Sequence, residues 1–431
     1  MKNSVQSIVP VIRSCAVFLI LLSVTTANVH AQSRFPRPEF QNGYELPVSD
    51  FGHARAVIFY YMDTAVLFIA LCAAAFLLLK KRSRTGIFAL TVFSVVYFGF
   101  YKKGCVCSIG AIQNVTASAF SDYAIPLSAA LFFLLPLLFS LFFGRVFCSS
   151  VCPLGAVQEF VILKPKRLPQ WITSALGLIP HLYLGTAVLF AATGAGFIIC
   201  RYDPFAGIFR LNAPLGMIIF GASLLAIGTV IARPYCRFLC PYGVILGFAS
   251  LFSKWSVRIT PNTCVNCRLC ENACPVGAIN TPSIEPVKER RSRSIKRLKT
   301  YLLLFPIWIT AGALTGWVLS DSISARHPQI KLTRSIELNK NSNAQFRSLE
   351  REGLRANSEV IAQLKEQSAS AKKNVKTGMI LLGTYMGIVT GIYLIRQSIH
   401  KKRNEYSADA VSCIGCGRCY KYCPQAVLYQ R

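Results

Sequence analysis

Seven long apolar segments constrain the fold of this 431-residue chain more than any other feature. They cover approximately residues 55–79, 86–103, 122–144, 173–198, 213–232, 301–320 and 377–396. Each is close to the length that a helix needs to cross a bilayer. Charged residues make up only 15% of the chain, whereas soluble domains carry roughly 25%. We therefore expect an all-α integral membrane protein with about seven transmembrane helices, because helices satisfy their own backbone groups in lipid.

The first 31 residues have the pattern of a signal peptide. Lys2 and Arg13 precede a short apolar stretch, and Val29-His30-Ala31 has the small residues of a cleavage site. An uncleaved anchor helix is the alternative. Cleavage would leave the new N-terminus outside, and seven crossings would then place the C-terminus inside. Basic residues agree with this topology, since 27 lie in the segments assigned to the inside and seven in the short outside segments.

The excess of basic residues also bears on the partners of the chain. There are 47 Lys and Arg against 18 Asp and Glu, which gives a net charge of +29. In a soluble protein this charge would indicate nucleic-acid binding. In a membrane protein it favours positive loops that contact anionic lipid, so we expect membrane lipid and not nucleic acid as the partner.

Two cysteine runs share the spacing C-x2-C-x2-C-x3-C-P, which is typical of bacterial ferredoxins that bind 4Fe–4S clusters. A zinc site would show paired cysteines separated by a longer gap, usually with histidine. In two-cluster ferredoxins the fourth cysteine of each run ligates the other cluster. The prediction is therefore one cluster on Cys264, Cys267, Cys270 and Cys423, and another on Cys413, Cys416, Cys419 and Cys274. The two runs would form a small split ferredoxin-like domain on the cytoplasmic side.

Two further motifs, each C-x3-C-P, follow the third and fifth apolar segments and have similar flanks, as an internal repeat would. Their cysteines are Cys148, Cys152, Cys236 and Cys240. Three interpretations stay open: a third iron–sulfur centre, two functional dithiols, or a structural role. A weaker copy contains Cys105 and Cys107. With Cys200 these cysteines are expected on the opposite, outer face, as a redox centre, a disulfide or unrelated thiols.

The expected organisation has five parts. A signal peptide covers residues 1–31, and a transmembrane redox domain with the two C-x3-C-P motifs covers 32–254. The first ferredoxin segment covers 255–300. A membrane hairpin follows at 301–396, with a polar periplasmic loop at 321–376. The second ferredoxin segment covers 397–431.

Together these motifs resemble the polyferredoxin membrane proteins of the NapH and NosR type, over roughly residues 55–275 and 413–424. The resemblance implies a protein of the bacterial inner membrane that takes electrons from quinol. It implies delivery of those electrons to periplasmic nitrate or nitrous-oxide reduction, directly or through a flavin or cytochrome subunit. This chain differs from the NosR type because it has no flavin-attachment motif. It also differs in the membrane hairpin that separates its two ferredoxin runs.

Few ionisable residues lie at membrane depth, and such residues are functional candidates. Asp63, Asp122 and Asp203 fall near the outer ends of spans, and His181 lies near the inner end of the fourth. A carboxylate or imidazole there could accept a proton from quinol. Phosphate loops, a Ser/His/Asp set and a dinucleotide fingerprint are absent from the sequence. The alternative to electron transfer is a redox sensor or an assembly factor for a metallo-reductase. A transporter is disfavoured because the spans are mostly Leu, Ala, Phe and Ile.

Overall fold

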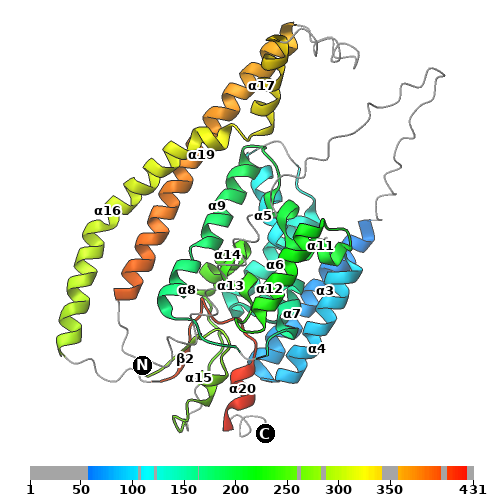
Figure 1. Ribbon diagram of the computed structural model, residues 1–431. Helices are drawn as coiled ribbons and strands as arrows, with labels where there is room; N and C mark the ends of the chain where they lie inside the picture. The colour runs from blue at the N-terminus through cyan, green and yellow to red at the C-terminus, as the bar shows by residue number, and fades with distance from the viewer. Residues whose placement is uncertain are drawn as a thin grey trace.

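The computed structural model describes residues 57–104, 108–120, 124–163, 165–259, 264–282, 288–341, 358–398 and 405–424. Figure 1 shows a body of packed helices, a long helical hairpin beside it and a small unit at one end. The body contains α3 (Val57–Ala75), η1 (Phe76–Lys80), α4 (Arg84–Ser94), η2 (Val95–Tyr101), α5 (Ser108–Phe120), α6 (Leu127–Phe143), η3 (Phe147–Val151), α7 (Pro153–Phe160), α8 (Gln170–Leu176), α9 (Ile179–Ala192), α10 (Ile198–Tyr202), α11 (Pro204–Arg210), α12 (Leu215–Gly228), α13 (Pro234–Phe238) and α14 (Pro241–Ser250), where η marks a π-helix.

The all-helical prediction is confirmed, but seven spans are not. Five helical stretches of the described residues are long and apolar enough to cross a membrane: Ile58–Lys80, Arg84–Tyr101, Trp171–Ala192, Ile295–Ser324 and Gln363–Ser398. Helices α11 and α12, bent by 111°, would make a sixth span if they count as one. The segment expected at 122–144 contains α6, which has only 17 residues and a proline inside it. It is therefore shorter than the ~20 residues that a span usually needs.

The hairpin consists of α16 (Lys288–Ser324) and α19 (Ser358–Ser398), with α17 (Pro328–Asn341) beside its tip. Both long helices continue well beyond the apolar segments at 301–320 and 377–396. Gly312 and Gly316 face Gly383 and Gly387 across the pair, and a Cβ on any of them would overlap the backbone of the other helix. Small residues spaced by four allow this close approach, which is a common way for helices to associate in membranes.

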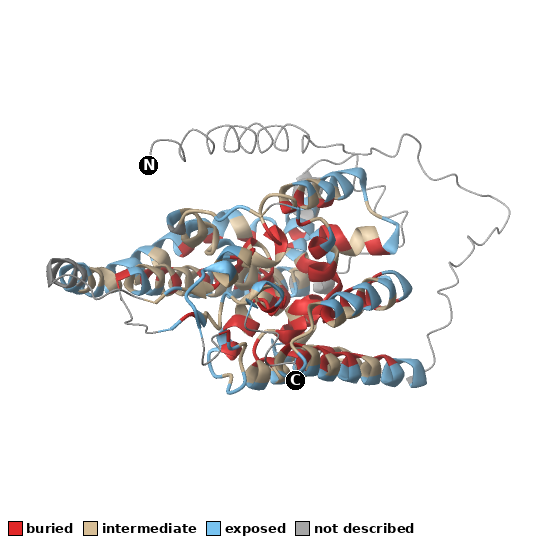
Figure 2. Cartoon of the chain, turned by 90° about the horizontal axis from the view of Figure 1, so that it is seen from below, coloured by how far each residue is buried: buried red, intermediate tan, exposed pale blue. Residues whose placement is uncertain are grey.

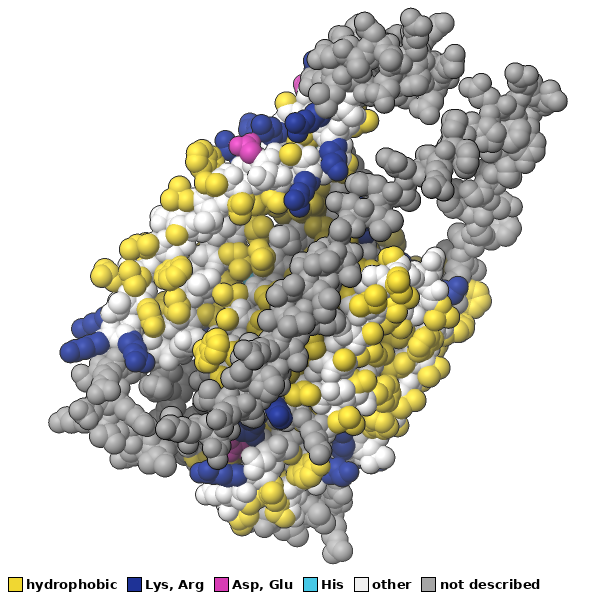
Figure 3. All heavy atoms as spheres, in the orientation of Figure 1, with side chains coloured by type: hydrophobic (Ala, Val, Ile, Leu, Met, Phe, Trp, Pro, Cys, Tyr) yellow, Lys and Arg dark blue, Asp and Glu magenta, His cyan; other side chains and the backbone are white. Residues whose placement is uncertain are grey.

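The outer surface of the helices is largely apolar. Figure 3 shows hydrophobic side chains along the sides of the body and hairpin, with Lys and Arg gathered toward the hairpin ends. On α16 alone, Leu302, Leu303, Ile307, Leu314 and Val318 are each more than half exposed. Figure 2 shows the buried residues concentrated inside the body. A surface of this kind would be costly in water, and it identifies a membrane protein.

The small unit brings together the two ferredoxin runs, although the hairpin separates them in sequence. Strand β1 (Ile279–Asn280) pairs antiparallel with β2 (Ser407–Ala408). Helix α15 (Leu269–Ala273) lies against α20 (Arg418–Tyr422). The amide of Asp409 also donates to the carbonyl of Ala278 at 2.8 Å. The two halves therefore form one split ferredoxin-like unit, which Figure 1 shows at the end of the body away from the hairpin tip.

Candidate metal centres

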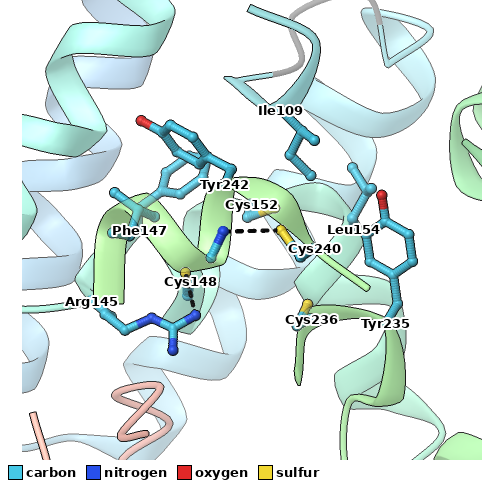
Figure 4. Close-up of a pocket in the computed structure, with 12 residues that line it drawn as sticks. Ile109, Arg145, Phe147, Cys148, Cys152, Leu154, Tyr235, Cys236, Cys240 and Tyr242 are labelled. Atoms are coloured by element: carbon cyan, nitrogen blue, oxygen red, sulfur yellow. Dashed lines mark hydrogen bonds between the residues drawn. The ribbon is translucent and has the colours of Figure 1, made fainter. Parts of the chain in front are cut away.

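The two C-x3-C-P motifs meet in one pocket inside the body. Figure 4 shows Cys148 and Cys152 from one motif facing Cys236 and Cys240 from the other. Cys240 is close enough to the other three sulfurs to interact with them electrostatically. The remaining lining residues are Ile109, Arg145, Phe147, Leu154, Tyr235, Tyr242, Gly243 and Leu246.

The proline of each motif explains how two of these thiols enter the pocket. Cys152 and Cys240 both have extended backbone, with ψ of 117° and 111°, because the residue before a proline avoids the helical region. Proline then occupies the first position of α7 and of α14, where its missing amide costs nothing. Each cysteine therefore caps a short helix, and the Gly243 amide donates to Cys240 Sγ at 3.3 Å.

The internal repeat is visible as an exchange of contacts between the copies. Each motif has an arginine three residues before its first cysteine and a glycine three residues after its last. A Cβ on Gly155 would lie 3.4 Å from Arg233 Nη1, and a Cβ on Gly243 would lie 3.1 Å from Arg145 Nη2. The glycine of each copy thus leaves room for the arginine of the other copy.

In the ferredoxin-like unit, thiols of each run lie near the fourth thiol of the other run. Cys413, Cys416 and Cys419 each interact electrostatically with Cys274. In the same way Cys270 interacts with Cys264, Cys267 and Cys423. This is the grouping that the ferredoxin spacing predicts. Burial raises the pKa of the Cys413 thiol to about 12, so a bound metal would have to displace its proton.

The two runs differ at the residues between their cysteines. The packing of the C-terminal run against the body explains the difference. Gly415 and Gly417 have φ of +65° and +69°, and Asn266 and Arg268 at the equivalent positions have +53° and +58°. A Cβ on Gly415 would lie 2.9 Å from Leu78, and one on Gly417 would lie 2.8 Å from Ile87. At these two positions the C-terminal run lies directly against side chains of the body, so its turns require glycine in addition to a positive φ.

One carboxylate joins the pocket to the C-terminal run. Glu159, on α7, has a fully buried side chain. It pairs with Arg233 at 2.9 Å, with Arg418 at 2.8 Å and with Arg84. Burial raises the pKa of Glu159, but the guanidinium charges of Arg233, Arg418 and Arg84 outweigh it and hold the pKa at about 2. The carboxylate is therefore ionised at neutral pH.

Arginine side chains also tie the motifs to one another through backbone carbonyls. Arg233 Nη2 donates to the Ser149 carbonyl at 2.9 Å, and Nη1 donates to the Cys148 carbonyl. Arg84 Nη1 donates to the Cys416 carbonyl at 2.6 Å. Arg145 Nη1 donates to the Val411 carbonyl at 2.7 Å, and its Nη2 lies 3.8 Å from Cys148 Sγ. The pocket and the C-terminal run are thus held in direct contact.

Among the described residues, the charges around these thiols are mainly positive. Four guanidinium groups converge here (Arg84, Arg145, Arg233 and Arg418), and Glu159 is the carboxylate that pairs with three of them. Buried positive charge without a counter-charge is costly. Thiolate is the form of cysteine that ligates metal, so metal-bound thiolates would supply the missing negative charge. The residues present therefore fit an iron–sulfur cluster in the pocket and another in the C-terminal run.

The four pocket thiols are not arranged around a single ion. Among the described residues, no three His, Cys, Asp or Glu side chains come close enough to hold one metal ion. A cubane spreads its four ligands further apart than one ion does. The spacing of the thiols agrees with a cluster or with two dithiols, and not with a mononuclear site.

The other sequence candidates occupy different places. Asp63 is buried in an ion pair with Lys102, and Tyr97 donates to its Oδ1 at 2.9 Å. Asp203 is buried as the cap of α11. His181 is half-buried on α9. Cys200 is exposed on α10, whereas Cys105, Cys107 and Asp122 lie outside the described residues. Ile109 lines the thiol pocket, so the helix that follows Cys107 begins inside the body.

Sequence reasoning missed the residue that joins the centres. Glu159 stands seven positions after Cys152, at the end of an apolar helix. A lone carboxylate in such a helix was the available signal, since buried charges in membrane proteins are rarely without function. Its three arginine partners are 74 to 259 positions away, and no spacing rule connects them.

Comparison with known proteins identifies both kinds of cysteine motif. One family of 4Fe-4S binding domain matches residues 125–171 and 212–260, which contain the two C-x3-C-P motifs. A second family of 4Fe-4S binding domain matches residues 257–280 and 407–429, which contain the two ferredoxin runs. No solved structure matches the chain.

Several curated proteins are similar over part of their length. Protein NirI of Paracoccus denitrificans is 30% identical over 253 residues, which is 50% of this chain and 37% of NirI. The putative electron transport protein YccM of Escherichia coli is 26% identical over 39% of this chain and 52% of YccM. The regulatory protein NosR of Pseudomonas aeruginosa is 29% identical over 47% of this chain and 30% of NosR. The chain thus spans about half or less of these relatives. Its motifs, its two kinds of 4Fe-4S binding domain and these relatives together support a 4Fe–4S membrane protein similar to the NapH and NosR type.

Proposed function

We propose that this protein passes electrons between the membrane quinol pool and a periplasmic reductase system. A cytoplasmic donor is the alternative source of electrons. In this proposal the protein lies in the bacterial inner membrane after loss of residues 1–31, and its ferredoxin-like unit faces the cytoplasm. The periplasmic acceptor is a reductase or the flavin or cytochrome subunit that serves it.

The proposal rests on three sets of four thiols that follow one another from the body to the surface of the protein. The first set lies in the body (Cys148, Cys152, Cys236 and Cys240). The second, Cys274 with Cys413, Cys416 and Cys419, is held against it through Glu159 and its arginines. The third set is Cys264, Cys267, Cys270 and Cys423, and its first two members are exposed. Such an arrangement suits electron transfer between the membrane interior and the surface of the protein.

Each set would hold one 4Fe–4S cluster, which when bound accepts and releases one electron at a time. The chain provides hydrogen bonds to the sulfurs. Gln158 Nε2 donates to Cys236 Sγ at 3.3 Å, and the Ala278 amide donates to Cys274 Sγ at 3.2 Å. Such hydrogen bonds, together with nearby charge, set the reduction potential of a cluster. The arginines beside the first two sets would raise these potentials relative to the exposed third set.

A second function is a redox sensor or assembly factor without sustained turnover. The observation that favours it is the name of one relative, since NosR is described as a regulatory protein. A sensor would need its clusters to change state only once per signal.

Turnover with a short-chain quinol separates the two functions. We expect the purified protein to oxidise many quinol molecules per chain when a soluble one-electron acceptor is present. Each quinol would release two electrons and two protons. Cys416→Ser should abolish this activity, and Cys72→Ser should not, because Cys72 is an exposed thiol in α3 outside the three sets. A single stoichiometric oxidation by the wild-type protein would contradict electron transfer and support the sensor.

A further inference from the structure

Of the residues that the sequence offers for quinol binding, two already have other partners. Asp63 is paired with Lys102 and accepts a hydrogen bond from Tyr97. Asp203 accepts from the amides of Phe205 and Ala206, and from the Tyr235 hydroxyl at 3.3 Å. These carboxylates hold the fold together. His181 is different, because only its Nδ1 has a partner, the Gly177 carbonyl at 3.0 Å.

Two tyrosines of the hairpin converge on His181. Its ring lies 5.8 Å from the ring of Tyr393, edge to face, and 6.3 Å from that of Tyr385, measured between centroids. Tyr385 and Tyr393 are eight positions apart and lie on the same side of α19. They are also close enough to interact electrostatically. The interface between α9 and α19 therefore brings together one imidazole and two phenols.

Two glycines frame this cluster, Gly177 at the end of α8 and Gly185 in α9. Gly177 and Gly185 lie one helical turn before and after His181. A Cβ on Gly177 would lie 3.0 Å from the Tyr393 hydroxyl, and a Cβ on Gly185 would overlap Leu382. The glycines let α19 approach α9 while leaving His181 as the side chain that separates them. Toward the hairpin tip the same interface is apolar, with Leu189 against Val375 and Met379.

Ring contacts and apolar packing join the two helices at the cluster, but hydrogen bonds within it do not. Among the described residues, neither this nitrogen nor either hydroxyl makes a hydrogen bond, although all three side chains are half-buried. A polar group without a partner is costly in an apolar environment. Three such half-buried groups at one interface can offer hydrogen bonds to a ligand.

The position also suits electron transfer to the thiols. Helix α9 packs against α13 and α14, which carry the second C-x3-C-P motif. Arg237, which follows Cys236, donates to Thr173 Oγ1 at 3.4 Å and interacts electrostatically with Cys274. The cluster thus lies one helix away from the pocket, at a membrane-exposed junction between the hairpin and the body.

We propose that His181, Tyr385 and Tyr393 bind the headgroup of a quinol. The two ring oxygens of the headgroup would pair with the imidazole and the phenols, and the isoprenoid tail would extend into lipid. This inference rests on the proposed function, since it places the quinol site of that same electron-transfer chain.

Binding of a fluorescent hydroxyquinoline N-oxide with an alkyl tail, a quinol analogue, tests the site without turnover. Fluorescence quenching gives its Kd with the purified, cluster-loaded protein. We expect His181→Ala, Tyr385→Phe and Tyr393→Phe each to raise Kd, by about tenfold where a hydrogen bond to the analogue is lost. The two Tyr→Phe changes remove only a hydroxyl, so they report on the site even if His181→Ala folds poorly.

Tyr61→Phe is the matched control, since Tyr61 is an exposed residue of α3, 51% accessible. Its Kd should equal that of the wild type, and the iron content of all variants should be unchanged. If the wild-type protein binds the analogue and both Tyr→Phe variants bind it equally well, this site is wrong while the proposed function stands. If the wild-type protein binds no analogue, quinol as the substrate is itself contradicted.

Discussion

The Cys274→Ser variant is expected to lose the cluster of the C-terminal ferredoxin run, although Cys274 belongs to the other run. Its sulfur interacts with Cys413, Cys416 and Cys419, and the β1–β2 pairing holds the two halves in that register. A serine hydroxyl is a poor ligand for iron in place of a thiolate. We expect a loss of about four iron atoms per chain, with an EPR spectrum of the reduced protein that matches the Cys416→Ser variant.

The reciprocal variant makes this prediction specific. Cys423→Ser should give the spectrum of Cys267→Ser, because Cys423 interacts with Cys270 of the N-terminal run. The opposite assignment, with Cys274→Ser matching Cys267→Ser, would show that each run binds its own cluster with all four of its cysteines. The two ferredoxin runs would then lie against each other without sharing any cluster ligand.

The Glu159→Gln variant is expected to lose about 3–5 kcal/mol of stability, the typical cost of breaking a buried ion pair. Glutamine would leave Arg84, Arg233 and Arg418 without their shared negative charge. Arg418 would also lose its anchor to the body, so the C-terminal run should dock more weakly. Denaturant titration in detergent, followed by the visible absorption of the clusters, measures the loss.

The pKa of Glu159 adds a pH signature to this prediction. The folded pKa of about 2 lies below the ordinary value of 4.5. The stabilisation is therefore fully present above pH 4.5 and is lost as the pH falls toward 2. Glu159→Gln should remove this acid dependence. Glu366→Gln, at an exposed position of α19, should change stability by less than about 0.5 kcal/mol and leave the dependence intact. Equal stability of both variants would mean that the ion pairs of Glu159 do not stabilise the docking of the C-terminal ferredoxin run.

Motif spacing could name the cysteines of the candidate centres because iron–sulfur ligands are local in sequence, and their binding of clusters stays a prediction. The C-x2-C-x2-C-x3-C-P runs place three thiols within seven residues, and the ferredoxin pattern adds the fourth from the other run. The likeness of the two C-x3-C-P flanks predicted an internal repeat, and Gly155 and Gly243 show it in their exchanged contacts with Arg233 and Arg145. Apolar length predicted the helical membrane fold in the same way.

Features that depend on tertiary contacts could not be predicted from spacing. The bend between α11 and α12, and the entry of α5 into the body beside the thiol pocket, both depend on how helices pack. Apolar length alone counted the α6 segment as a span, although the helix has 17 residues. The hairpin helices extend past their apolar segments because polar residues can continue a helix outside the membrane. The meeting of Tyr385 and Tyr393 with His181 requires α9 and α19 to be neighbours, which no local pattern specifies.

The iron and acid-labile sulfide content of the anaerobically purified protein tests the central claim most directly. Three thiol sets predict about twelve iron atoms and twelve sulfides per chain, and EPR after reduction should show three interacting centres. In a Cys148→Ser/Cys236→Ser variant the iron content should fall to about eight. About eight iron atoms in the wild-type protein, unchanged in that variant, would contradict a cluster in the body. The C-x3-C-P cysteines would then act as dithiols or structural residues, and the ferredoxin-like unit alone would carry the electrons.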